Sequence, residues 1–234
     1  MAPKASGQTT DTTAADTTAV KKVKRVERAG HQLCLGVDIA RPIINSMVSN
    51  SFGYDFAAEY YLRNEFFAEA EGGWGGSKVT YTDLAYNSNN SFFRLGFNKS
   101  ILARERPTDW DMMFFGMRAG YAAVTRGAAS YTVIDSVWGN ESGSKPGKSF
   151  SAVWAELAAG MRVELFRGIS GGWTIRGKFL MNGRSFKDLS PLYIAGYGRG
   201  DKNTAFDFNV YLSYAIRWRR ARAMHTTPDP DIRK

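Results

Sequence analysis

Residues on which many catalytic and metal sites depend are scarce in this chain. There is one cysteine, Cys34, and there are two histidines, His31 and His225, among 234 residues. A single cysteine excludes an intramolecular disulfide, and these residues are too few for the Cys and His ligands of a structural zinc site. No GxSxG or HExxH motif is present either. We therefore expect no catalytic residue, no metal site and no cofactor, and we interpret the protein as a non-enzyme.

Long apolar runs are also absent. The chain has no run of about 18 apolar residues, which excludes a transmembrane helix. It does not exclude a membrane protein, because β-barrel strands alternate apolar and polar residues and are invisible to a mean hydropathy, here −0.33. The segment that begins at Met1 is rich in Thr, Ala and Asp and lacks the apolar core of a signal peptide. Because an outer-membrane protein needs such a signal, we expect it to have been removed from this sequence or missed.

In place of long apolar runs, the chain alternates apolar and polar residues. Within 205–218, every even position is apolar or aromatic, whereas the odd positions include Asp207, Asn209 and Arg217. A period of two over this length predicts a β-strand whose two faces meet different surroundings. One face is continuously apolar and the other carries charges, which is typical of a barrel wall between lipid and a polar lumen.

Eight segments of this kind follow one another along the chain. They cover residues 33–40, 54–62, 65–74, 93–98, 113–121, 153–165, 173–182 and 205–218, and Met112 and Phe114 blur the pattern of the fifth. The connections alternate between short ones (63–64, 102–109 and 167–168) and long ones (41–53, 75–90, 125–150 and 183–203). This alternation is typical of outer-membrane barrels. We therefore predict an all-β fold, an eight-stranded antiparallel up-and-down transmembrane β-barrel with a disordered N-terminal tail.

The predicted barrel spans residues 32–218 and leaves two tails. Residues 1–31 form a disordered basic N-terminal tail and residues 219–234 a C-terminal tail, and with eight strands both termini lie on the periplasmic side of the outer membrane. The first tail carries six basic and three acidic residues and the second five and two, so the tails hold six of the nine net positive charges. No basic stripe lies on a folded element, so we expect no nucleic-acid partner. Outer-membrane lipid is the expected partner.

Charged side chains gather on the inward faces of the predicted strands. Because its own side chains fill an eight-stranded barrel, and because unpaired buried charges are costly, we expect an interlocked ion-pair network that holds the barrel closed. A gated small pore or a proton path is the alternative function of the same residues. The predicted network comprises Asp38, Glu59, Glu69, Glu71, Arg94, Arg118, Glu156, Arg162, Glu164, Arg176, Lys178, Asp207 and Arg217.

Two of the long connections, 125–150 and 183–203, are unusually apolar for solvated loops. One interpretation is that they fold over the barrel mouth and bury their apolar residues against each other. The other is a docking surface for another outer-membrane or periplasmic protein, or for a lipid. The candidate residues are Tyr131, Val133, Ile134, Val137, Trp138, Leu192, Tyr193, Ile194 and Tyr197.

Several short motifs give the chain a family resemblance. They are LGVDIARPIIN at 35–45, AEGGWGG at 70–76, KPGKS at 145–149, RGKF at 176–179 and YGRGDKN at 197–203. Over residues 32–218 the chain resembles a Bacteroidota outer-membrane β-barrel family of unknown function. The resemblance implies a location and a fold, and it implies no catalytic residue.

These observations favour a non-enzymatic outer-membrane barrel. Small barrels of this phylum can be accessory subunits of machines for protein secretion or barrel assembly, so we expect an accessory or structural subunit of a larger complex. The alternatives are a small gated pore and a barrel that binds a ligand or lipid through its loops. A soluble lipocalin-like carrier would need an apolar lumen and a polar outer wall, the reverse of the alternation found here.

Overall fold

A computed structural model of the chain describes residues 30–47, 50–102, 108–133, 139–183 and 190–218. The predicted tails, apart from Gly30 and His31, lie outside these ranges. No helix in the described ranges is both long and apolar enough to cross a membrane. The elements are β1 (Gln32–Asp38), α1 (Ala40–Met47), β2 (Ser51–Tyr61), β3 (Phe66–Thr80), β4 (Leu84–Ser100), β5 (Met112–Arg126), β6 (Ala129–Val133), β7 (Glu141–Lys145), β8 (Lys148–Phe166), β9 (Ile169–Leu180) and β10 (Thr204–Arg217).

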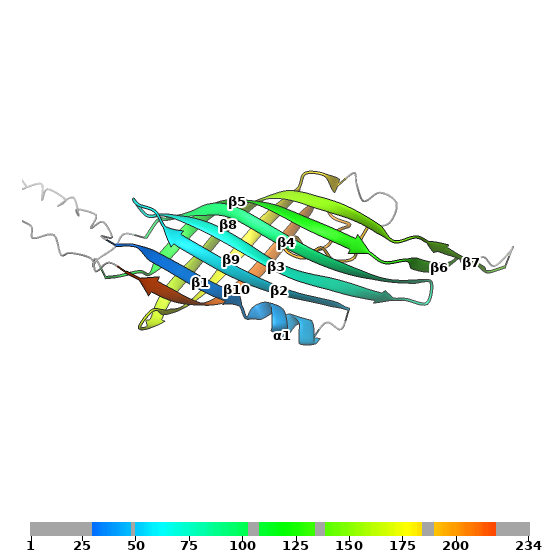
Figure 1. Cartoon of the computed structure of the whole chain (residues 1–234), viewed down its shortest axis with the longest axis horizontal. Coiled ribbons are helices and arrows are strands. Elements are labelled where there is room, and N and C mark those ends of the chain that lie inside the picture. Colours follow the sequence, from blue (N-terminus) through cyan, green and yellow to red (C-terminus); the bar gives the residue numbers. More distant parts are fainter. Residues whose placement is uncertain (1–29, 48–49, 103–107, 134–138, 184–189, 219–234) are drawn as a thin grey trace, which may run out of the picture.

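Eight of these strands close into an antiparallel barrel (Figure 1). Their order around the barrel is β1, β2, β3, β4, β5, β8, β9 and β10, and β10 pairs back with β1 from Gln32 opposite Arg217 to Asp38 opposite Tyr211. The predicted eight-stranded antiparallel barrel is therefore confirmed. We call the end with connections 62–65, 101–111 and 167–168 the short-turn rim. The opposite end, with α1 and residues 190–203, is the long-loop rim.

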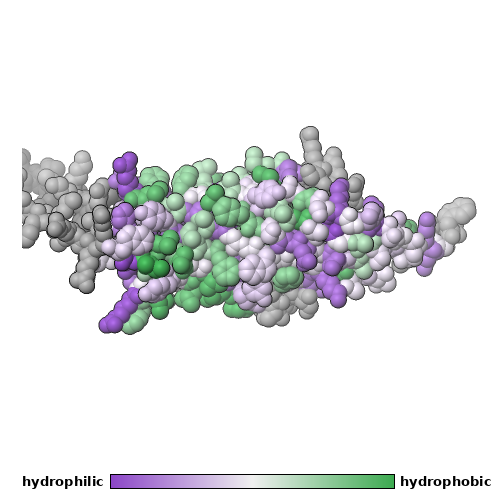
Figure 2. All heavy atoms as spheres, in the orientation of Figure 1, coloured by the Kyte–Doolittle hydropathy of each residue, from purple (hydrophilic) through white to green (hydrophobic). Residues whose placement is uncertain are grey.

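The two faces of the barrel wall differ as the alternation predicts. Burial alternates at every residue of β5, from buried Met112 through exposed Met113 to buried Arg126. Figure 2 shows apolar side chains over the middle of the barrel and hydrophilic ones toward its ends. This is the reverse of the wall that a lipocalin-like carrier needs. The exposed apolar residues of the wall include Leu35, Val37, Tyr54, Phe56, Trp74, Phe93, Leu95, Phe97, Phe115, Met117, Tyr121, Leu157, Ile175, Phe179, Phe208, Leu212, Tyr214 and Ile216.

Inward-facing glycines make room for the large charged side chains of the lumen. Gly120 lies between Arg94 and Trp154 across three neighbouring strands, and a Cβ atom at residue 120 would overlap the Trp154 indole. Gly96 has the corresponding place between Glu69 and Arg118. Alternation of small and large side chains is how a narrow barrel is filled.

Residues 75–90 are not the long loop that their Gly, Ser and Asn content suggests. β3 continues to Thr80 and β4 begins at Leu84, so that only a tight turn joins them. The pairing is carried by the backbone, and the hydroxyls of Ser77 and Ser88 meet inside the sheet at 2.9 Å. Small polar residues therefore form strands here because a hydrogen-bonded ladder does not depend on apolar side chains.

The connections 41–53 and 125–150 also contain regular structure that was not predicted. Helix α1 begins after Asp38, whose carboxylate accepts a hydrogen bond from the Ala40 amide at 2.9 Å in the manner of an N-cap, and Pro42 occupies its first turn. β6 and β7 form a hairpin that extends the sheet beside β4, with Leu84 opposite Tyr131. The sheet therefore continues past the mouth of the barrel (Figure 1).

A cluster of apolar side chains closes the lumen near the short-turn rim. Because Met112 and Phe114 face inward into it, they interrupt the apolar–polar alternation of β5 without changing its register. The two residues that blur the pattern of the fifth predicted segment thus belong to an apolar layer, which we call the floor of the barrel. The cluster consists of Tyr61, Phe67, Trp110, Met112 and Phe114.

Candidate functional site

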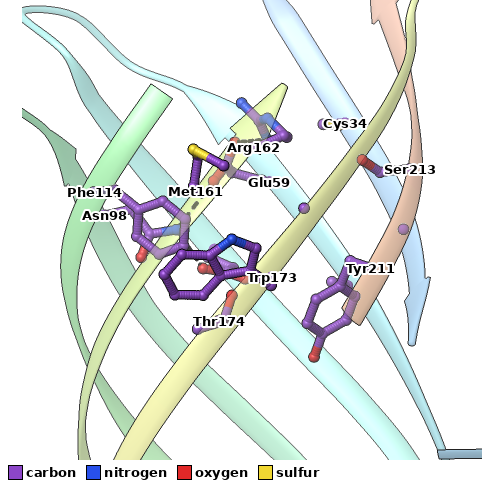
Figure 3. A pocket seen from close by; sticks show the side chains of 14 residues that line it. Cys34, Glu59, Asn98, Phe114, Met161, Arg162, Trp173, Thr174, Tyr211 and Ser213 are labelled. Atoms are coloured by element: carbon purple, nitrogen blue, oxygen red, sulfur yellow. Dashed lines mark hydrogen bonds and ion pairs between the residues drawn. The ribbon is translucent and has the colours of Figure 1, made fainter. Parts of the chain in front are cut away.

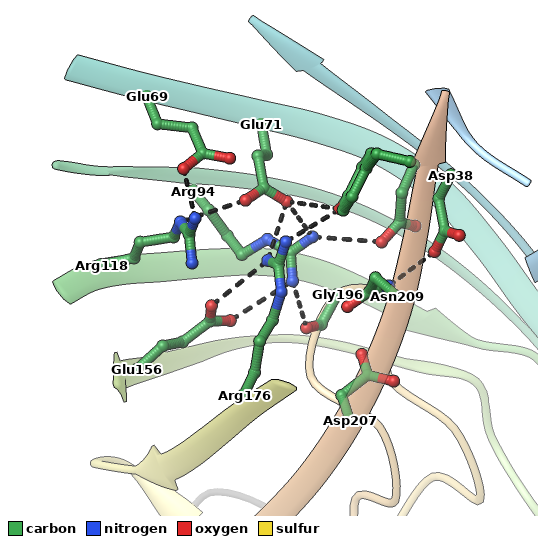
Figure 4. Close-up of polar contacts among 12 residues, drawn as sticks. Asp38, Glu69, Glu71, Arg94, Arg118, Glu156, Arg176, Gly196, Asp207 and Asn209 are labelled. Atoms are coloured by element: carbon green, nitrogen blue, oxygen red, sulfur yellow. Dashed lines mark hydrogen bonds and ion pairs between the residues drawn. The ribbon is translucent and has the colours of Figure 1, made fainter. Parts of the chain in front are cut away.

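A cluster of buried charges crosses the middle of the lumen, centred on Glu71 of β3 (Figure 4). Its carboxylate accepts hydrogen bonds from Arg94 at 2.5 Å and from Arg176 at 2.8 Å. The Tyr211 hydroxyl donates to it at 3.0 Å, and Arg118 Nε lies 3.1 Å away. These partners come from β4, β9, β10 and β5, so one carboxylate joins five strands across the lumen.

Arg94 is the most highly connected cation of this cluster. It is fully buried, and besides Glu71 it contacts Asp55 at 3.1 Å and Glu156 at 3.4 Å. It also donates to the main-chain carbonyl of Gly196 at 3.1 Å. The Trp154 indole donates to Glu156 at 2.6 Å, which holds that carboxylate toward the arginines. Several carboxylates therefore share the charge of one guanidinium.

The network continues from the centre toward the short-turn rim. Arg118 pairs with Glu69, and Asn98 donates to Glu69 at 2.5 Å and to Glu59 at 3.0 Å. Glu59 in turn pairs with Arg162. The uncharged Asn98 side chain thus links the Arg118–Glu69 and Arg162–Glu59 ion pairs. The residues of this group come from β2, β3, β4, β5 and β8.

Glu164 and Arg217 form an outer ion pair at the short-turn rim itself. Their closest atoms are 2.6 Å apart, and both side chains are partly exposed, at 21% and 28%. Arg217 also donates to Gln32 at 3.0 Å. Because solvent screens an exposed pair, we expect it to stabilise the barrel less than the central cluster does.

On the side of the long-loop rim, a second group of charges surrounds Asp207. Lys178 donates to Asp207 at 2.7 Å, and Arg41, which reaches into the barrel from α1, pairs with the same carboxylate. Arg41 also lies 3.8 Å from Asp38, to which Asn209 donates at 2.5 Å. An arginine from outside the barrel strands therefore completes this part of the network.

Residues 190–198, which we call the plug segment, close the lumen above the charge network. Ile194, Ala195 and Tyr197 have no exposed surface and pack with Phe92 and Trp154 inside the mouth of the barrel. Of the candidate docking residues, Ile194 and Tyr197 are thus buried rather than available to a partner. This corrects the docking interpretation for both side chains, because burying an apolar side chain inside the barrel is more favourable than exposing it.

The other candidate docking residues have varied positions. Leu192 and Tyr193 are half-buried in the plug segment, and burial raises the pKa of the Tyr193 hydroxyl to about 12. Tyr131 and Val133 lie in β6, where Val133 is exposed. Three residues lie outside the described part of the chain: Ile134, Val137 and Trp138.

The plug segment is tied to the charges below it through Gly196. Its carbonyl accepts hydrogen bonds from Arg94 at 3.1 Å and from Lys178 at 2.7 Å. Gly196 has a φ of 77°, in the left-handed region, and a Cβ atom there would lie 2.5 Å from the ring of Phe92. Only glycine combines this backbone conformation with this close approach.

We expect Gly196→Ala to loosen the plug segment while the strands stay paired. The left-handed φ alone costs about 1–2 kcal/mol for a residue with a side chain, and the contact with Phe92 adds to it. The measurement is hydrogen exchange, which should become faster at the amides of Tyr197 and Gly198 that now bond to the Ile194 carbonyl. Gly139→Ala is the matched control, because Gly139 has a similar φ of 87° with open space around it. Equal exchange in both variants would contradict this account.

A small cavity lies inside the barrel between the central cluster and the floor (Figure 3). Its volume is about 50 Å³, and Cys34, Glu59, Thr174, Tyr211 and Ser213 are among the residues that line it. A water molecule needs about 10–15 Å³ of such space, whereas ligand pockets have about 300–1,000 Å³. The cavity therefore has the size for a few water molecules and not for an organic ligand.

Each of the thirteen predicted charged residues has an ion-pair partner, eleven of them inside the barrel and Glu164 and Arg217 at the short-turn rim. Asp55 and Asn98 also belong to the network; both occupy inward positions of the alternating segments but were not among the predicted residues. Arg41 and the Gly196 carbonyl were not predictable from alternation, because neither belongs to a strand. Among the described residues, no group of three or more His, Cys, Asp and Glu side chains is arranged to hold a metal ion.

Comparison with protein families shows a match over nearly the whole chain. The model of a family described as "Domain of unknown function (DUF6048)" matches residues 2–220. The match begins at residue 2, so it includes the N-terminal segment that the motif resemblance over 32–218 leaves out. No curated protein matches the chain.

Proposed function

This chain belongs to the family of domains of unknown function DUF6048, and we propose that it is a sealed, non-enzymatic outer-membrane β-barrel of a bacterium of the phylum Bacteroidota. In this proposal it acts as an accessory or structural subunit of a larger outer-membrane complex, for protein secretion or barrel assembly. The observation that carries the proposal is the filling of the lumen at several levels along the barrel.

The lumen is filled at three successive levels. The apolar floor around Phe67 and Met112 lies near the short-turn rim, the charge network around Arg94 lies in the middle, and the plug segment lies at the mouth. Phe67, Met112 and Arg94 each have no exposed surface. Because side chains fill the lumen at each of these levels, we propose that the outer wall, rims and loops are the surfaces through which the barrel acts.

The outer wall supports a location in a lipid bilayer. Exposed aromatic and aliphatic side chains cover all eight barrel strands, and hydrophilic residues lie toward both ends (Figure 2). At the short-turn rim, Lys99 lies over the ring of Phe66 at 4.1 Å and Arg167 over that of Phe166 at 5.4 Å. Aromatic rings paired with cations suit the boundary between hydrocarbon and headgroups. We place this rim, and with it the first and last residues of the barrel, Gln32 and Arg217, on the periplasmic side.

Cross-linking in native membranes tests the proposed role. We expect a tagged chain, expressed at its normal level, to resist carbonate extraction and to be isolated with one or two stoichiometric partners. An unrelated tagged barrel at the same level is the control for partners captured by proximity alone. Isolation of the chain as a lone species after mild solubilisation would count against a subunit of a complex.

We also expect purified protein to be electrically silent in planar bilayers, because the charge network and the plug segment fill the lumen. The measurement is single-channel current over the range in which other small barrels conduct. Discrete current steps that change in Arg118→Gln would favour the gated pore instead, because Arg118 lies in the lumen and contacts both Glu69 and Glu71.

A further inference from the structure

An apolar groove runs across the outside of the barrel over β4, β5, β8, β9 and β10. Its volume is about 520 Å³, which is within the range of ligand sites, about 300–1,000 Å³. It is separate from the lumen and from the plug segment, and it lies on the wall that the proposed function places in lipid.

The strand register creates this groove by placing small residues between large ones. Gly177 lies between Leu157 and Phe206 in one row across the strands. In the neighbouring row, Ala159 lies between Phe115 and Ile175. The small residues form the floor and the larger side chains form the walls, so the groove follows the pairing direction of the sheet.

One end of the groove carries a positive charge. Lys99 lines it, level with Phe66 at the short-turn rim. The Lys99 ammonium donates to the Asn64 carbonyl and lies 4.1 Å from the centre of the Phe66 ring. An ammonium group has three donors, so Lys99 can also donate to an anion at this end of the groove.

We infer that the groove binds one acyl chain of a glycerophospholipid, whose phosphate lies beside Lys99. This inference rests on the proposed membrane location. An apolar groove whose floor is formed by small residues between larger ones fits a single flexible hydrocarbon chain better than the broad surface of another protein. The cation at the end nearer the headgroup level complements the negative charge of the lipid phosphate. Because an acyl chain in a bilayer is already surrounded by hydrocarbon, van der Waals packing in the groove drives binding, and Lys99 sets the orientation of the lipid.

Native mass spectrometry of the full chain in mild detergent tests the inference. The probes are a phosphatidylglycerol and the diacylglycerol with the same chains, which lacks the phosphate. We expect one molecule of phosphatidylglycerol to saturate the wild type. Lys99→Gln should weaken phosphatidylglycerol binding about fivefold, as loss of one basic residue at an anionic surface does, and should leave diacylglycerol binding unchanged.

Filling the groove tests the contribution of the acyl chain. We expect Gly177→Leu to weaken the binding of both probes about tenfold, the effect of losing roughly ten van der Waals contacts of the acyl chain. A Cβ atom at residue 177 would be 3.6 Å from the Phe206 ring, an ordinary contact, so the variant has room to fold. Ala159→Phe is the second variant with the same expected effect. Ala70→Leu, on the outer face of β3 and away from the groove, is the matched control and should bind as the wild type does.

The outcomes separate this inference from the proposed function. If the wild type and Gly177→Leu bind equally well, or if lipid adds without saturation at one molecule, the groove is not a lipid site, whereas the membrane location stands. If the wild type is monodisperse without detergent, the proposed location fails, and the inference fails with it. A protein that occupies the groove and excludes phosphatidylglycerol would also overturn the lipid assignment.

Discussion

The Arg94→Met variant is expected to lose about 3–5 kcal/mol of unfolding free energy, the range found when one partner of a buried ion pair is removed. Arg94 is fully buried, and its guanidinium faces Glu71, Asp55 and Glu156. Methionine fills a similar volume but leaves these carboxylates with fewer cations in a site without solvent. The measurement is urea unfolding in lipid vesicles, followed by tryptophan fluorescence and by far-UV circular dichroism.

Two further variants show whether charge is the cause. Arg199→Gln removes an exposed arginine whose only described ion pair is with Asp201, and its urea midpoint should match the wild type. Arg94→Met combined with Glu71→Gln removes one charge of each sign, and we expect it to be more stable than Arg94→Met alone. If the double variant is less stable than the single one, hydrogen bonding to Glu71 and not charge balance dominates this site.

The barrel was predictable from the sequence because the two faces of every barrel strand lie in different surroundings, one outside the barrel and the other in the lumen. In 205–218, each apolar residue at an even position faces outward, and Asp207 and Asn209 face the lumen. The same alternation placed Glu71, Arg94 and Arg176 on the inward faces before any pairing was known. A period-two pattern needs no knowledge of neighbouring strands, so local sequence was sufficient for the number of barrel strands and for the charged lumen, whereas β6 and β7 were not predicted.

Features that depend on distant pairing were not predictable in the same way. Ser77 and Ser88 belong to strands because their backbones pair, and their side chains resemble those of a loop. Arg41 reaches Asp207 from a helix, across 166 residues of sequence. Gly196 contributes its backbone carbonyl, a group that every residue has. Its positive φ cannot be inferred from the presence of a glycine alone. These features are set by tertiary geometry, which leaves no local pattern in a single sequence.

The Gly120→Leu variant is expected not to form the native barrel. Gly120 faces the lumen between Arg94 and Trp154, and a Cβ atom there would overlap the indole of Trp154, which has no exposed surface. Overpacking a core costs about 1–3 kcal/mol when neighbours can move. Here the Trp154 indole is also bonded to Glu156 at 2.6 Å, so a shift of the ring disturbs the charge network as well. Gel mobility without heating, together with the circular dichroism of protein refolded into micelles, measures the folded fraction.

The same substitution at Gly177 is the control, since both glycines lie in barrel strands and differ in the side of the wall they face. We expect Gly177→Leu to refold to the wild-type extent, because its side chain enters the groove outside and meets Phe206 at an ordinary distance. A second test is Gly120→Leu with Trp154→Ala, which removes the overlapping ring and should recover part of the folded fraction. If Gly120→Leu refolds as well as Gly177→Leu does, the side chains in the lumen are packed less tightly than the ion pairs indicate, and the lumen is not sealed in the way we propose.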